Sequence, residues 1–199
     1  MNKHKTVRIF MILFFILLIL AAIYFFMMLR FRGSVKVHPD KDISVTDNLI
    51  LYRQDNSSWA ADHLGDSSFI MKKSGCLVTC IASALGSTPK NLNEVFSKNH
   101  VYDSEGNILW NRISNVNDNY KVEVYSEVSE EILMNCLENE RFPIVRVRMH
   151  GFGNFHYVLI VKAEGGVFYC MDPLRDELAP LTVYGNRVYA VRCVYVESY

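Results

Sequence analysis

Two cysteines four positions apart, Cys76 and Cys80, stand at the start of a predicted buried helix in the stretch KSGCLVTCIA. Gly75 comes directly before them and puts Cys76 in or near the first helical turn. The positive end of the helix dipole stabilises a thiolate there, the form of cysteine that attacks a carbonyl carbon. Cys80 lies one turn deeper among apolar residues. The pattern predicts Cys76 as a nucleophile and Cys80 as a core side chain, although burial is the commoner role of a free cysteine.

A nucleophilic cysteine needs a base, and His156 is the only histidine at the head of a strongly apolar strand, HYVLIVK. The other histidines lie in polar or loop segments or before the first apolar run. An imidazole beside the thiol could take its proton and later protonate a leaving amine. A histidine in such a strand is otherwise a hydrogen-bonded core or edge residue, so the prediction depends on a group that orients the ring.

Asp172 ends the second strand of a predicted hairpin whose first strand begins at His156. A three-residue loop at 163–165 centres the pairing on Glu164 and puts the aspartate directly opposite the histidine, on the same face. The carboxylate would then hold the imidazole in the orientation that a catalytic triad requires. A loop one residue shorter or longer would turn the two side chains to opposite faces. Asp172-Pro173 is also a common way to open a turn.

Gln54 follows a short strand predicted at 49–52. A side-chain amide close to the nucleophile could stabilise an oxyanion together with the backbone N–H of Cys76. A glutamine in this position is otherwise a surface residue. Trp110 and Tyr157 are candidates for the lining of a substrate cleft, as is Trp59, although aromatic residues more often pack in the core.

A metal site is the alternative use of Cys76 and Cys80, which share one face of the predicted helix. Cys170 and His156 could be added as further ligands. Structural zinc sites, however, combine one closely spaced thiolate pair with a matching second pair, and the sequence has no second pair. We therefore predict no metal and no cofactor.

The elements that must position these residues follow from the hydrophobic pattern. Apolar residues at helical spacing run from Cys76 to a stop at Gly86, a second helix starts at Thr88-Pro89, and a third opens at Ser129. After Pro143 the period changes to two. Strands are predicted at 143–149, 156–162, 167–172 and 187–196. Helices followed by strands indicate an α+β fold with N-terminal helices packed on a mainly antiparallel sheet.

The beginning of the chain has a different character. An unbroken apolar run from Ile9 to Leu29 is long enough, at about 1.5 Å per residue, to cross the roughly 30 Å interior of a bilayer. No small-residue cleavage site follows it, so it is predicted to remain as a single transmembrane anchor. The predicted organisation is a basic tail at 1–8, the anchor at 9–29, a linker at 30–47 and one soluble domain at 48–199.

The charge distribution and the cysteine count bear on membrane orientation, binding partners and disulfide bonds. Basic residues on the two sides of the apolar run are nearly balanced, but a short basic tail before one apolar helix favours an extracytoplasmic domain on a single-pass membrane protein. The net charge is zero, so nucleic acid is not an expected partner. The 5 cysteines have no regular spacing and do not indicate a disulfide framework.

Four segments in chain order resemble the peptidase C39-like family of papain-like cysteine peptidases. The resemblance spans 49–173 and rests on LYRQDNSSWAADHLG, MKKSGCLVTCIASALGSTPKNL, RFPIVRVRM and HYVLIVKAEGGVFYCMDP. It implies a papain-like fold with Cys76 as nucleophile, His156 as general base and acid, Asp172 as the orienting group and Gln54 as oxyanion-hole donor. The family commonly has residues like Gly-Pro-Thr-Ser after the cysteine, whereas this chain has LVTC, a difference that concerns substrate preference more than chemistry.

These observations together predict a membrane-anchored cysteine peptidase that acts on a peptide or protein substrate. One alternative is a cell-wall peptide amidase or endopeptidase, because the same chemistry cleaves peptide cross-links in wall polymers. Another is a catalytically idle papain-like module that binds or regulates a partner at the membrane. The distance between the sulfur and the imidazole distinguishes catalysis from binding.

Overall fold

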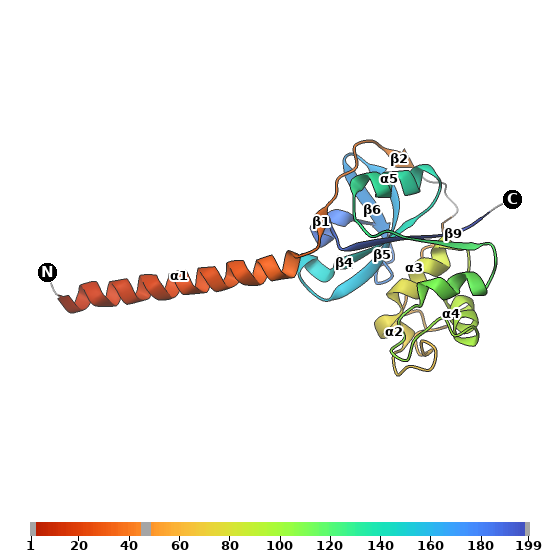
Figure 1. The fold of residues 1–199 in the computed structure, drawn as a ribbon, viewed down its shortest axis with the longest axis horizontal. Helices are drawn as coiled ribbons and strands as arrows, with labels where there is room; N and C mark the ends of the chain where they lie inside the picture. Colours follow the sequence, from red (N-terminus) through yellow and green to blue (C-terminus); the bar gives the residue numbers. More distant parts are fainter. Residues whose placement is uncertain (1–2, 45–48, 198–199) are drawn as a thin grey trace. The chain divides into compact units, whose positions relative to one another are not determined.

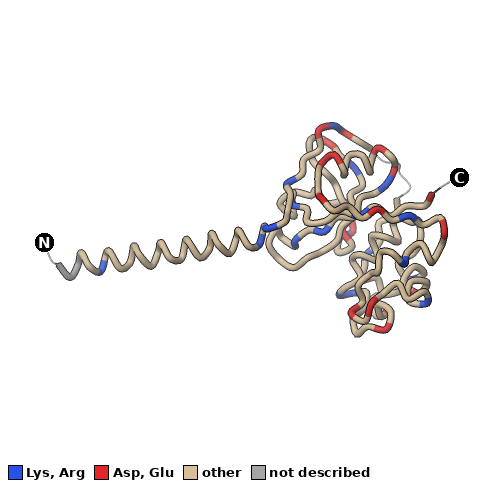
Figure 2. The backbone as a smooth tube through the Cα atoms, in the orientation of Figure 1, with Lys and Arg blue, Asp and Glu red and all other residues tan. Residues whose placement is uncertain are grey.

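The computed structural model of the protein describes residues 3–44 and 49–197. The chain divides into two compact units, Met1–Gly33 and Ser34–Tyr199. The first unit consists of helix α1, Lys3–Phe31, which contains the predicted span 9–29. From Thr6 to Phe31 this helix is long and apolar enough to cross a membrane, and no charged residue interrupts its middle (Figure 2).

The second unit combines helices with an antiparallel sheet. Its helices are α2 (Met71–Ser74), α3 (Cys76–Ala84), α4 (Pro89–Lys98) and α5 (Glu130–Glu138), with 3-10 turns η1 (Trp110–Asn115), η2 (Met149–Gly151) and η3 (Leu181–Tyr184). Its strands are β1 (Val35–Lys36), β2 (Ile43–Ser44), β3 (Tyr120–Val124), β4 (Pro143–Arg148), β5 (Phe155–Glu164), β6 (Val167–Met171), β7 (Ala179–Pro180), β8 (Arg187–Val188) and β9 (Ala190–Val196).

The main sheet has the strand order β3-β9-β4-β5-β6-β7, and β2 adds to β5. Every pairing between the described strands is antiparallel. Helices α2, α3 and α4 lie together on one side of the sheet and α5 lies on the other (Figure 1). Each side has its own apolar cluster, one under α3 and α4 and one under α5. The mixed helix and antiparallel-sheet architecture predicted from the pattern is therefore present.

Local sequence signals explain where the helices begin and end. The Thr88 hydroxyl accepts a hydrogen bond from the Asn91 N–H at the start of α4, and the Ser129 hydroxyl accepts one from the Ile132 N–H at the start of α5. These are the bonds that N-cap residues provide to otherwise unpaired helical N–H groups. Gly86, just beyond α3, has a φ of +66°, the left-handed backbone that glycine adopts without strain.

Two N-terminal predictions differ from the structure. Residues 49–52 are irregular and form no strand. Parts of the predicted linker 30–47 belong to the domain, because β1 pairs with β8 and β2 pairs with β5. Val37, between these two strands, is fully buried in the cluster under α5. Two-residue strands leave no periodic signal in a sequence, which explains why they were not predicted. Residues 45–48 lie outside the described residues.

The hairpin between β5 and β6 has a register that differs from the predicted one. Its turn contains two residues, because Glu164 pairs with Val167, and the central glycines at 165–166 both have positive φ. Such a turn alone would put the side chains of 156 and 172 on opposite faces. The register shifts between Ile160 and Lys162, so Val161 is one extra residue in β5. This bulge restores the alternation, and residues 156 and 172 share a face although they are not directly opposite.

A disulfide joins Cys136 on α5 to Cys193 on β9. The two cysteines are 57 residues apart in sequence, and their spacing gave no indication of a pair. They meet because α5 packs against the sheet face on which Cys193 lies. The three remaining cysteines, Cys76, Cys80 and Cys170, are free thiols.

Candidate active site

Cys76 is the first residue of α3 and is only partly buried. The chain passes from α2 into α3 through Gly75, which ends one helix and caps the next. A Cβ at this glycine would lie 2.6 Å from the Met71 carbonyl oxygen and 2.8 Å from the Met71 sulfur. The junction between α2 and α3 therefore requires glycine, because a side chain there would collide with Met71 of α2, and Cys76 lies at the N-terminal end of α3 as predicted.

His156 lies near the start of β5 and interacts with both Asp172 and Cys76. Its Nε2 lies 2.7 Å from Asp172 Oδ1, and the Cys76 side chain interacts with the same ring and raises its pKa. Burial lowers the pKa of His156, but the interactions with Asp172 and Cys76 outweigh it and raise this pKa to about 9. The imidazolium is thus the favoured form at neutral pH.

Asp172 is 1% exposed and accepts hydrogen bonds on both carboxylate oxygens. Oδ1 accepts from His156 and from the Leu174 N–H at 2.9 Å, and Oδ2 accepts from Arg175 Nε at 3.2 Å and from the Tyr184 hydroxyl. Burial raises the pKa of Asp172, but the bonds from His156 and Tyr184 reverse this and lower it to about 2. The carboxylate stays ionised and fixes the ring. The bond from Leu174 also confirms that Asp172-Pro173 opens a turn.

Gln54 is 3% exposed and lies between the segments that carry the other site residues. Its backbone N–H donates to the Pro173 carbonyl at 2.9 Å, directly after Asp172, and its side-chain Nε2 donates to the Lys72 carbonyl of α2 at 2.9 Å. An amide nitrogen carries two N–H donors, so one remains for another acceptor. The Gln54 Oε1 is buried without a hydrogen-bond partner in the described part of the chain. Because Gln54 is buried, it is not a surface residue.

The second cysteine of the motif has a different environment. Cys80 is fully buried, and its thiol donates to the Tyr157 carbonyl at 3.6 Å. Burial raises the pKa of this thiol well above its ordinary value. Among residues 3–44 and 49–197, no group of three or more His, Cys, Asp or Glu side chains is arranged to hold a metal ion. Cys80 packs in the core, and the motif KSGCLVTCIA is asymmetric.

A small cavity of about 160 Å³ opens beside the Cys76 thiol. Trp110 and Tyr157 line it, as predicted for a cleft, together with residues of α3 and of the loop at 106–108. Trp59 belongs to the core instead, where its indole N–H donates to the Arg53 carbonyl at 2.9 Å. The Cys76 thiol therefore lies beside a cavity that has two aromatic lining residues, Trp110 and Tyr157.

Tyr184 and Arg175 are site residues that the sequence did not indicate. Tyr184 lies in η3 and reaches back to Asp172 across twelve residues of chain. Burial and the adjacent carboxylate raise the pKa of its hydroxyl, so it remains a hydrogen-bond donor. Only the fold brings η3 against the end of β6, and no spacing rule predicts this contact. Arg175 is found through the turn that Asp172 opens.

Replacing Tyr184 with phenylalanine is expected to move the acid side of the Cys76 alkylation profile to higher pH. The hydroxyl helps to lower the pKa of Asp172 to about 2, so its loss lets this pKa rise towards the ordinary value of about 3.9. Alkylation at pH 4 should then fall more than alkylation at pH 7, which should change by less than about tenfold. Tyr102→Phe, which removes a buried hydroxyl bound to Asn93, is the matched control. Equal losses at both pH values would indicate a structural role only.

Comparisons with known proteins bear on the fold. No protein-family model matches the sequence. No curated protein sequence matches it. The structure is similar to the crystal structure of a candidate C39-like peptidase from Bacillus anthracis, with a TM-score of 0.51 and 13% sequence identity over 80% of this chain and 100% of that chain. At this identity the likeness concerns the fold: this chain has a mixed helix and antiparallel-sheet fold that resembles that C39-like peptidase.

Proposed function

We propose that the protein is a membrane-anchored cysteine peptidase with a papain-like fold. One observation carries the proposal: the free Cys76 thiol at the start of α3 interacts with His156 and raises the pKa of its ring, and Nε2 of this ring is bound to the buried Asp172. Nucleophile, base and orienting group are thus connected in the order that covalent hydrolysis needs. The fold of the Bacillus anthracis protein, which is described as a C39-like peptidase, supports the same class of reaction.

The reaction begins when the Cys76 sulfur attacks the carbonyl carbon of a peptide bond and forms a carbon–sulfur bond. The carbonyl electron pair moves to the oxygen, and this oxyanion accepts hydrogen bonds from the Cys76 N–H and the free N–H of Gln54 Nε2. The His156 imidazolium then protonates the leaving amine as the carbon–nitrogen bond breaks. A thioester remains. His156 next removes a proton from water, the water oxygen attacks the thioester, and the carboxylic acid leaves as the thiolate re-forms.

The proposed anchor and compartment follow from two further features. Helix α1 is long and apolar enough to hold the protein in a membrane. The Cys136–Cys193 disulfide suits an oxidising environment, because cytosolic thiols are kept reduced. The helix favours a single-pass membrane protein, and the disulfide favours a domain on the extracytoplasmic side. Wall peptides would be accessible substrates there, as would secreted or surface proteins.

The full chain in detergent micelles is expected to cleave peptides, with one water added for each bond broken. Mass spectrometry of an unfolded protein and, in parallel, of purified wall peptides identifies the products and separates the two substrate classes. Cys76→Ala is the control and should give no products. A wild-type protein that cleaves neither substrate while its Cys76 reacts normally with iodoacetamide would favour the idle binding module instead.

A further inference from the structure

Three arginines lie close together on the sheet. Arg146 and Arg148 lie on β4 and Arg192 lies on the neighbouring β9. Arg146 pairs with Tyr157 of β5, and Arg192 pairs with Ile144 of β4. Residues paired in this way point to the same face of a sheet. The three side chains, called here the arginine patch, therefore share the face on which α3 packs.

The patch has no acidic partner in the part of the chain that the structure describes. None of its guanidinium groups forms an ion pair with a described carboxylate, and the buried Nε of each of the three has no hydrogen-bond partner. Other arginines of the domain do have acidic partners: Arg53 pairs with Asp55, and Arg141 pairs with Glu123. The patch is thus a local excess of positive charge in a chain whose net charge is zero.

Aromatic rings hold the guanidinium groups in place. The Arg146 and Arg148 guanidinium carbons lie 4.3 Å and 3.9 Å from the centre of the Phe155 ring, and that of Arg192 lies 5.5 Å from the Trp110 ring. Arg148 Nη1 donates to the Gly153 carbonyl at 2.9 Å and Arg192 Nη1 to the Val191 carbonyl at 2.7 Å. Rings attract the cations over their faces, and a guanidinium has five N–H donors, so further donors remain for an anion. Burial lowers the pKa of Arg192, and the neighbouring charge of Arg146 lowers it further, against an opposing effect of Tyr157. An anion bound between the arginines would relieve this repulsion.

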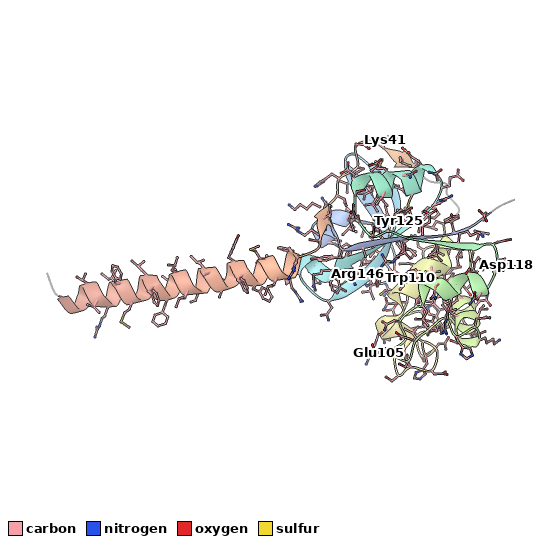
Figure 3. The ribbon with its side chains drawn as sticks, in the orientation of Figure 1. Lys41, Glu105, Trp110, Asp118, Tyr125 and Arg146 are labelled. Atoms are coloured by element: carbon pink, nitrogen blue, oxygen red, sulfur yellow. A yellow bond between two sulfur atoms is a disulfide. The ribbon has the colours of Figure 1, made fainter. Side chains whose placement is uncertain are left out.

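The patch continues the cavity beside Cys76. Trp110 and Tyr157 line that cavity, while Trp110 also lies under Arg192 and Tyr157 is paired with Arg146. Figure 3 labels Arg146 and Trp110 among the side chains of the domain. A substrate held at the thiol would therefore have its neighbouring residues within the field of the arginines.

We propose that the arginine patch binds a carboxylate of the substrate, so that the site prefers peptides with an acidic residue near the cleaved bond. The inference rests on the proposed peptidase function. Arginine presents paired N–H donors that match a carboxylate, and such charge-assisted bonds are stronger than neutral ones. The half-buried, ring-stacked guanidinium groups suit a side chain that reaches into the site, whereas contact with a membrane surface calls for fully exposed basic residues.

Binding of matched peptide pools to full-length Cys76→Ala tests the proposal without turnover. The two pools differ only in that every glutamate of one is glutamine in the other. Fluorescence anisotropy should give an affinity at least about tenfold higher for the glutamate pool, decreasing with added salt. Adding Arg146→Gln or Arg192→Gln should bring the two affinities together, and Lys90→Gln, which removes an exposed charge on α4, should leave the difference intact.

The outcomes separate this inference from the proposed function. Equal affinity for the two pools would overturn the acidic preference, including the case in which the patch contacts anionic lipid instead, while the wild type could still cleave both. If the wild type cleaves neither pool, the proposed function fails and the inference with it. The comparison between pools uses one folded protein, so it does not depend on whether the arginine variants fold.

Discussion

Replacing Cys76 with alanine is expected to abolish both peptide cleavage and labelling by a peptide-like electrophile, a loss of at least about 10³-fold. The reason is the position of the sulfur. It is only partly buried, it lies beside the cavity lined by Trp110 and Tyr157, and it interacts with His156. No neighbouring side chain can replace a removed nucleophile, so the residual rate should equal the uncatalysed background.

Cys80→Ala is the matched control for this experiment, because it removes the same atom one helical turn away. The Cys80 thiol is fully buried and bonded to the Tyr157 carbonyl. Its loss should leave labelling unchanged and lower the free energy of unfolding by about 1 kcal/mol through the small cavity and the missing hydrogen bond. Mass spectrometry of the labelled peptide identifies the reacting cysteine. Labelling that persists in Cys76→Ala and disappears in Cys80→Ala would reverse the assignment.

Replacing His156 with alanine is expected to slow alkylation of Cys76 at least about tenfold at pH 6.5 and to change the shape of the pH profile. The raised pKa of His156, about 9, favours its charged form. In the wild type the imidazolium therefore stands beside the Cys76 sulfur from neutral pH up to about pH 9 and is lost above it. Without the imidazole the sulfur has no such cation beside it at any pH, so the change in rate near pH 9 should disappear. Rates measured with iodoacetamide from pH 5 to 10 check this.

His38→Ala provides the comparison, since this exposed histidine contacts Asn186 and Glu130 rather than any site residue. Its profile should coincide with that of the wild type. If His156→Ala reproduced the wild-type profile as well, the imidazole would have no part in activating the thiol. Circular dichroism of both variants checks that the fold is intact.

The sequence predicted the parts of the site that depend on local signals. Gly75 before an apolar helix located Cys76, because a helix start can be read from one glycine and a period. The strand that begins at His156 and the turn that opens at Asp172 were likewise visible in the alternation and the turn residues. Their common face followed from the hairpin, although the loop length and register used for it differ from those observed.

The contacts that were not predicted all join segments distant in the chain. Tyr184 reaches Asp172 from η3, and Cys136 on α5 meets Cys193 on β9. The arginine patch needs β4 and β9 to be neighbours, and their order in the sheet follows from the packing of the whole domain. Alternation shows which face a strand residue occupies but not which strand will lie beside it, so one sequence alone leaves such partners open.

The bulge at Val161 makes the site sensitive to whether the number of residues between the two partners is odd or even. Strand side chains alternate with period two, so removing one residue from either the bulge or the turn would separate the ring of His156 from the carboxylate of Asp172. Two compensating changes would leave them together, as in a hairpin with a three-residue turn and no bulge. A single deletion in this hairpin is therefore expected to disrupt the site. A deletion in the bulge that is accompanied by an insertion in the turn is expected to preserve it.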